Sequence, residues 1–229
     1  MLSQRTIKNK ITCSGVGLHT GKKVKLTFHP AEPNTGILFR RIDGDKVVDI
    51  PATAKNVGET TLSTTLVYGD YKISTIEHLL SALAGTGVDN CIIDCDGPEI
   101  PIMDGSSTQF VFLIQTAGIV EQNAVKKFVY VTKSVQVQRD DAVARIKPYD
   151  GFRVTFTLEF DHPVYNKYPH SASIDFSQTS FIREVSRART FGLMDDLEKL
   201  KKMNLALGAN LNNAIGIGDE DVLNEGGLR

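Results

Sequence analysis

The sequence predicts an α+β fold made of two similar domains. In each half of the 229-residue chain, segments that alternate apolar and polar side chains come first, and segments with helical periodicity follow them. Glycine, proline and asparagine separate many of these segments, as is typical of turns. We expect the first domain at residues 1–122 and the second at 126–229, with the polar run 121–123 as the linker.

Strands dominate the beginning of each predicted domain. Residues 23–28 alternate polar and apolar side chains, as a half-buried strand does. The other strands that we expect span residues 37–40, 62–68, 90–94, 128–131, 135–138, 142–146, 152–160 and 214–217. The glycine-rich run 15–21 lacks the Gly-Lys-Ser/Thr ending of a phosphate-binding loop, and we interpret it as a turn between two strands.

Helical spacing of apolar residues identifies the helices. The first helix carries its apolar stripe on Ile76, Leu79, Leu80 and Leu83. Ser74, followed three residues later by Glu77, matches a capping box, and Gly85 and Gly87 are expected to end this helix. Further helices are expected at residues 108–117, 181–188 and 195–203.

Two positions carry candidate chemistry but leave alternatives open. At about 100° per residue, His78 points almost opposite the apolar stripe of its helix, so it would face solvent or the second domain. A metal site between domains would suit that position, whereas the plain alternative makes Glu77 a helix cap and His78 an exposed histidine. Thr190, which lies between two predicted helices, could support an oxyanion or serve as an N-cap.

Composition excludes several other classes of protein. The formal net charge of −1 gives no global basic surface to attract nucleic acid, and no apolar run reaches the ~18–20 residues of a membrane span. The first residues lack an apolar signal core, which predicts a cytoplasmic protein. The three cysteines do not form a disulfide scaffold; Cys91 and Cys95 would lie ~13 Å apart on one strand, so we expect buried thiols.

Several stretches in order resemble one family, the zinc-dependent UDP-3-O-acyl-N-acetylglucosamine deacetylases of lipid A synthesis in Gram-negative bacteria. They are GVGLHTG at 15–21 with PNTG at 33–36, STIEHL at 74–79, PEIPIMDGS at 98–106, SRARTFG at 186–192 and VLNE at 222–225. The resemblance implies two α+β domains, each a sheet with helices, with the helix layers sandwiched between the two sheets. It also implies a catalytic Zn²⁺ between the domains and an acylated UDP-N-acetylglucosamine as substrate.

The resemblance assigns roles to individual residues of this sequence. His78 matches a zinc ligand, Glu77 matches the general base that takes a proton from the attacking water, and Thr190 matches the hydroxyl that helps to hold the oxyanion. The positions that match the apolar passage for the acyl chain are Phe191, Leu193, Leu197 and Ala206. Phe160 falls near the nucleotide end, and His19 falls on the rim of the site.

The resemblance also places two further zinc ligands, a histidine and an aspartate, on a helix after residue 229. We therefore expect residues 1–229 alone to bind zinc weakly, to lack deacetylase activity and to leave apolar surface open on the helices of the second domain. The alternative is a non-catalytic fragment or paralogue that binds an acylated sugar nucleotide. The sequence gives neither the preferred acyl length nor the oligomeric state.

Overall fold

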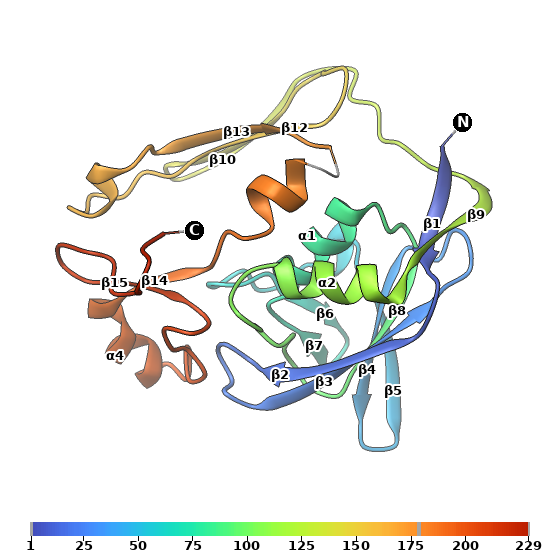
Figure 1. Ribbon diagram of the computed structural model, residues 1–229, viewed down its shortest axis with the longest axis horizontal. Coiled ribbons are helices and arrows are strands. Elements are labelled where there is room, and N and C mark those ends of the chain that lie inside the picture. The colour runs from blue at the N-terminus through green and yellow to red at the C-terminus, as the bar shows by residue number, and fades with distance from the viewer. Residues whose placement is uncertain (1, 178–179, 229) are drawn as a thin grey trace.

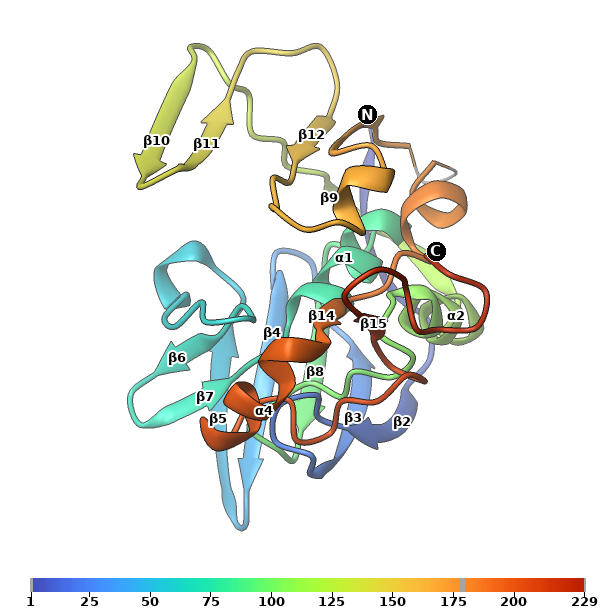
Figure 2. The ribbon, with the colours of Figure 1, turned by 90° about the vertical axis from the view of Figure 1, so that its left-hand side faces the viewer.

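The computed structural model of the chain describes residues 2–177 and 180–228 (Figure 1). Strands and helices are mixed along the chain, which confirms the α+β prediction. Helices α1 and α2 lie between the large sheet of the first half and the strand hairpins of the second half (Figures 1 and 2). Within the described residues, no helix is both long enough and apolar enough to cross a membrane.

The first half is built on a five-stranded sheet. In spatial order its strands are β2 (Ile11–Val16), β3 (Lys23–Pro30), β8 (Cys91–Cys95), β4 (Ile37–Asp43) and β5 (Lys46–Pro51). Strands β4 and β8 pair in parallel, and the other neighbours pair antiparallel. The turn expected at residues 15–21 does connect two strands, β2 and β3.

Two helices close one face of this sheet. Helix α1 (Glu77–Thr86) and helix α2 (Thr108–Ala117) share one apolar core with the sheet. Alternation places every second residue of β3 and β8 in this core, which explains why Cys91 and Cys95 are both buried, as expected for inert thiols. Among the largest fully buried side chains are Phe28, Phe39, Phe110, Leu26 and Ile93.

The polar run 121–123 is not a linker. It belongs to strand β9 (Ile119–Val125), which pairs antiparallel with β1 (Ser3–Ile7). The Gln122 amide donates to the Ala31 carbonyl at 2.8 Å and accepts from the Asn90 side chain at 2.8 Å. The linker prediction was wrong because these polar side chains form hydrogen bonds within the fold. The division at 1–122 and 126–229 stays a proposal.

The second half contains small strand pairs. Strand β10 (Val135–Arg139) pairs with β11 (Ala142–Ile146), and β12 (Arg153–Thr157) pairs with β13 (Ser171–Asp175). Parallel strands β14 (Phe191–Leu193) and β15 (Ile215–Ile217) lie beside helix α4 (Met194–Lys202). The remaining elements are β6 (Leu66–Tyr68), β7 (Tyr71–Ile73) and the short helices η1 (Ala54–Asn56), η2 (Tyr165–Lys167) and η3 (Phe181–Val185).

Three local predictions differ from the structure. Residues 128–131 form no strand, and their exposed backbone has no neighbouring strand to pair with. The strand expected at 62–68 begins only at Leu66, because Leu62 has a positive φ of 55° that interrupts extended backbone. The helix expected at 181–188 is a single π-helical segment, Phe181–Val185, anchored by buried Phe181 against the core of the first half.

Candidate active site

One cavity of about 590 Å³ gathers most of the residues that the sequence singled out. Seven of them line it: His19, Phe160, Thr190, Phe191, Leu193, Leu197 and Ala206. The first half contributes Leu18, His19 and Leu62, and the second half contributes the other walls through β14, α4 and the segment 206–216. The cavity therefore lies between the two halves of the chain.

Helix α4 provides the apolar wall of the cavity. Leu197 and Leu200 lie on α4 at helical spacing and line the cavity, together with Leu193 just before the helix and Met203 just after it. No side chain of α4 itself is fully buried, so its apolar face is open toward the cavity. Such a wall suits an alkyl chain.

An aromatic cluster closes one end of the cavity. The rings of Phe160 and Tyr165 stack with 4.9 Å between their centroids. The Phe191 ring packs edge-on to both, at 5.6 Å from Tyr165 and 6.2 Å from Phe160. Because edge-on and stacked pairs hold rings in defined orientations, Phe160 and Phe191 are fixed as cavity walls.

His19 occupies the rim with one ring nitrogen unused. The side chain is 8% exposed, and its Nδ1 accepts a hydrogen bond from the Ala206 N–H at 3.4 Å. Its Nε2 is buried and finds no partner among the described residues. When Nδ1 accepts a hydrogen bond, the ring hydrogen is on Nε2, a buried donor without a partner among the described residues.

Glu77 does not act as the expected capping residue. Helix α1 begins at Glu77, its N-cap is Ile76 without a side-chain hydrogen bond, and Ser74 Oγ donates to the Pro98 carbonyl at 3.3 Å. The Glu77 carboxylate instead accepts the backbone N–H of Thr64 at 3.0 Å. The capping-box prediction was wrong because a neighbouring loop, not the helix end, satisfies the carboxylate.

His78 is half-buried, so the alternative of an exposed histidine was wrong. It lies outside the buried stripe of α1, which consists of Leu79, Ala82, Leu83 and Thr86. Burial lowers the pKa of His78, while the negative charges of Glu77 and Asp104 act in the opposite direction. A lowered pKa favours the neutral imidazole at neutral pH, which is the form that binds metal ions.

The residues around His78 fit part of a zinc site. A histidine beside acidic side chains is a suitable donor set for zinc, but such a site needs about three protein ligands. Across residues 2–177 and 180–228, no group of three or more His, Cys, Asp or Glu side chains could hold a metal ion. His78 and Glu77 do not line the 590 Å³ cavity, so the structure does not join them directly to the other predicted residues.

Thr190 lies where the second half meets the first. Its N–H donates to the Gly105 carbonyl at 2.9 Å, and its carbonyl accepts from the Ile215 N–H at 2.8 Å. The N-cap of α4 is Leu193, so the alternative that made Thr190 an N-cap was wrong. Backbone hydrogen bonds on both sides of Thr190 hold it at the cavity wall.

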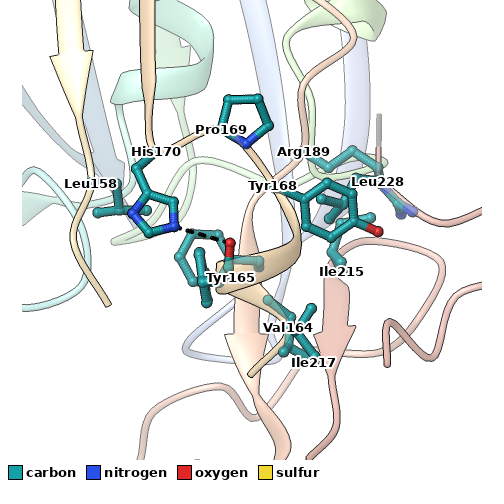
Figure 3. Close-up of a pocket in the computed structure, with 11 residues that line it drawn as sticks. Leu158, Val164, Tyr165, Tyr168, Pro169, His170, Arg189, Ile215, Ile217 and Leu228 are labelled. Atoms are coloured by element: carbon teal, nitrogen blue, oxygen red, sulfur yellow. Dashed lines mark hydrogen bonds between the residues drawn. The ribbon is translucent and has the colours of Figure 1, made fainter. Parts of the chain in front are cut away.

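Tyr165 of the aromatic cluster also lines a second, smaller cavity of about 180 Å³ (Figure 3). It shares Phe191 and Ile215 with the larger cavity. His170 lines this cavity, and its Nε2 is 3.1 Å from the Tyr165 carbonyl oxygen (Figure 3). Burial raises the pKa of Tyr165 to about 12, so the Tyr165 hydroxyl stays protonated at neutral pH.

Sequence reasoning missed several residues of the site. Leu18 and Leu62 line the larger cavity, but the sequence placed them only in a turn at 15–21 and a strand at 62–68, without a sign that either faces a site. The segment 206–216 packs against the loop 17–21 through backbone hydrogen bonds from Leu207 N to His19 O and from Gly208 N to Leu18 O. Contacts between residues so far apart in the sequence leave no local pattern. Gly208 is the one residue that indicates this contact, because a Cβ at this position would collide with the backbone of the loop 17–21.

Comparison with known proteins extends the match to the whole chain. A family model described as UDP-3-O-acyl N-acetylglycosamine deacetylase matches residues 4–229. A protein of Methylococcus capsulatus named UDP-3-O-acyl-N-acetylglucosamine deacetylase is 58% identical over all 229 residues, which cover 75% of that relative. Relatives of the same name from Pseudomonas entomophila and Alcanivorax borkumensis are 58% and 57% identical, with 76% and 75% of their lengths covered. The chain therefore belongs to the UDP-3-O-acyl-N-acetylglucosamine deacetylase family.

Proposed function

We propose that this protein takes part in zinc-dependent hydrolysis of the acetamide of UDP-3-O-acyl-N-acetylglucosamine, with release of acetate. The observation that carries this proposal is the 590 Å³ cavity, which brings Thr190 together with all six residues predicted to bind the substrate. The names of the three relatives agree with the same substrate and reaction.

The walls of the cavity suggest how the substrate lies. The apolar face of α4, with Leu197, and the nearby Leu193 and Ala206 suit the acyl chain. Phe160, at the aromatic end, is proposed to contact the nucleotide part. His19, which lines the cavity, is proposed to contact the sugar at the rim.

His78 would hold the zinc ion, because its imidazole is kept neutral by burial and stands beside acidic groups. When bound, zinc supplies Lewis-acid polarisation and makes a water molecule more acidic. The resemblance places the other ligands after residue 229. We therefore propose that a polypeptide of residues 1–229 alone binds zinc weakly and releases little acetate.

Glu77 and Thr190 would carry out the proton transfer and the stabilisation of the oxyanion. Glu77, oriented by the Thr64 N–H, takes a proton from the attacking water, whose oxygen forms a bond to the acetamide carbonyl carbon. Thr190 donates a hydrogen bond to the developing oxyanion. The C–N bond then breaks, the sugar nitrogen takes up the proton, and acetate and a free amine result.

The test compares two polypeptides. One is residues 1–229, and the other joins these residues to the unmatched remainder of the Methylococcus capsulatus relative. We expect the chimera to release acetate from the acylated nucleotide, to lose this activity with a chelator and to regain it with added zinc. Acetate release that is insensitive to the chelator would contradict the proposal.

A second candidate function is binding of the acylated nucleotide without turnover. That candidate is favoured by the fact that the cavity is present while the described residues contain no three-ligand metal cluster. Calorimetric titration of residues 1–229 with the acylated nucleotide should show binding even where acetate release is absent. Stoichiometric, tight zinc in residues 1–229 would overturn the proposal of a weak zinc site.

A further inference from the structure

A buried carboxylate lies at the junction of three segments around the site. Glu99 is 0% exposed, although it stands in the short stretch Pro98-Glu99-Ile100-Pro101 just after strand β8. Glutamate is almost never fully buried unless its oxygens are satisfied, because removing a carboxylate from water is costly. The partners of Glu99 therefore indicate why it is there.

The first group of partners belongs to the loop that carries His19. The His19 N–H donates to Glu99 Oε1 and the Thr20 N–H donates to Glu99 Oε2, both at 2.8 Å. A Cβ at Gly17 would lie 2.8 Å from Glu99 Cδ, so glycine is what lets this loop wrap closely around the carboxylate. The carboxylate of Glu99 thus fixes the backbone of this loop through two hydrogen bonds.

The second partner belongs to the segment that leads into α1. Thr75 Oγ1 donates to Glu99 Oε1 at 3.1 Å. Thr75 has a positive φ of 57°, a conformation that is uncommon for a β-branched residue and persists only where surrounding contacts impose it. The next residues along the chain are Ile76, Glu77 and His78, so the conformation of Thr75 decides the direction in which α1 starts.

The loop that Glu99 holds also connects to the second half of the chain. The carbonyls of His19 and Leu18 accept the N–H groups of Leu207 and Gly208, at 3.1 and 2.9 Å. The adjoining Ala206 N–H donates to His19 Nδ1 and lines the cavity. Displacing the loop would therefore move both the His19 ring and part of the acyl-chain wall.

We infer that Glu99 is a positioning residue that fixes two separated parts of the site: the His19 loop at the cavity rim and the start of the helix that presents Glu77 and His78. This inference rests on the proposed function for its meaning in catalysis. Its structural core, which is one carboxylate shared by His19, Thr20 and Thr75, can be tested independently of turnover.

The Glu99→Gln variant makes a sharp test because it keeps the shape of the side chain. Its single oxygen can stay with the two donors at Oε1, His19 N–H and Thr75 Oγ1, which places its NH₂ group opposite the Thr20 N–H. We expect the Thr20 amide to exchange with solvent at least about 10-fold faster, with a smaller change at His19 and none at Leu26 or Ile93 in the sheet. The exchange is measured by NMR on the 229-residue chain, with the exposed Glu121→Gln as the matched control.

Two outcomes would overturn the inference. One is an unchanged exchange rate at Thr20 in Glu99→Gln. The other is a uniform rise that includes Leu26 and Ile93, because this would mean that Glu99 supports only general stability. Binding of the acylated nucleotide, measured by calorimetry, should weaken about 10-fold in Glu99→Gln and stay unchanged in Glu121→Gln. If residues 1–229 do not bind this nucleotide, the proposal that they bind the substrate fails, while the Thr20 measurement still decides the role of Glu99.

A second pair of variants covers the case in which Glu99→Gln does not fold. Thr75→Val keeps the side-chain shape but removes the hydroxyl donor, whereas Thr75→Ser keeps the donor. We expect faster exchange at the Leu80 amide, which bonds to the Ile76 carbonyl in the first turn of α1, in Thr75→Val but not in Thr75→Ser. Equal behaviour of the two variants at Leu80 would contradict the link between Glu99 and the start of α1.

Discussion

The carboxylate of Glu77 accepts a hydrogen bond from the backbone N–H of Thr64, with 3.0 Å between Oε2 and N. The same loop places Leu62 in the wall of the 590 Å³ cavity. The residue proposed as general base is therefore oriented by a segment that also contacts the proposed acyl-chain passage. Backbone hydrogen bonds from Thr65 N–H to the Glu59 carbonyl and from Ile76 N–H to the Thr64 carbonyl also hold this loop.

The roles proposed for Glu77 and Thr190 predict unequal losses of activity. In the chimera that carries a complete zinc site, Thr190→Ala should lower kcat about 10²–10³-fold, as expected for one oxyanion donor. Glu77→Ala should lower it further, because it removes proton transfer and also frees the loop at Thr64. Acetate release under saturating substrate measures both, and activity of Glu77→Ala equal to that of the parent protein would eliminate Glu77 as the base.

If α4 contacts the acyl chain, shortening a side chain of its cavity face should weaken binding of the acylated nucleotide only. Leu197 lines the cavity and α4 has no fully buried side chain, so Leu197→Ala should weaken binding of the acylated nucleotide about 5–10-fold with little effect on the free energy of unfolding. Lys201→Ala, on the same helix but outside the cavity lining, is the control. Calorimetry with UDP-N-acetylglucosamine, which lacks the acyl chain, should show no difference; an equal loss for both ligands would argue against an acyl-chain wall.

Local patterns predicted the elements whose partners lie close in the sequence. The helix at 108–117 and the strand at 142–146 have the predicted bounds, because the helix carries a full apolar stripe and the strand pairs with the next strand of its own hairpin. The run 121–123 of strand β9 was mistaken for a linker because its partners are distant in the sequence: β1 pairs with its backbone, and Ala31 and Asn90 bond to Gln122. The strained Thr75 and its partner Glu99 were invisible for the same reason.

Some features of the candidate site could also be predicted from the sequence, and others could not. Resemblance singled out seven of the residues that line the cavity, whereas Glu77 and His78 lie outside its lining. Periodicity alone placed His78 away from the apolar stripe of its helix, and the structure agrees. The hydrogen bond from Thr64 to Glu77 could not be predicted, because it depends on a loop whose backbone turns at Leu62, a residue type that rarely takes a positive φ.

The three thiols should react slowly in the folded protein. Burial raises the pKa of Cys91 to about 12 and those of Cys13 and Cys95 to about 11. Because the thiolate is the nucleophile, alkylation by iodoacetamide at pH 8 should be at least about 100-fold slower than for free cysteine, with partly buried Cys13 reacting first. Mass spectrometry at successive time points measures the order in which the three cysteines are alkylated. In urea, which unfolds the protein, all three should react at similar rates.

The same shifts have a consequence for stability at high pH. A thiol whose pKa is higher in the folded than in the unfolded chain holds its proton longer when folded. Its contribution to stability is fully present below the unfolded value of 9.0 and is lost as pH rises through about 11 to 12. Replacing Cys91 by alanine should therefore flatten the decline of stability between these values; a decline of unchanged steepness would contradict burial as its cause.

Because α1 packs on η3, Gly85→Ala should have opposite effects on the free energy of unfolding in the parent protein and in a Phe181→Ala variant. A Cβ at Gly85 would overlap the ring of Phe181, which is 2% exposed and has no room to move. Gly85→Ala should therefore lower the free energy of unfolding by about 1–2 kcal/mol, although alanine is the better helix former. In a Phe181→Ala background the obstacle is gone, and the same substitution should raise stability by up to about 1 kcal/mol. Urea denaturation of the four proteins measures this coupling, and the same sign in both backgrounds would show that η3 does not pack on α1 at Gly85.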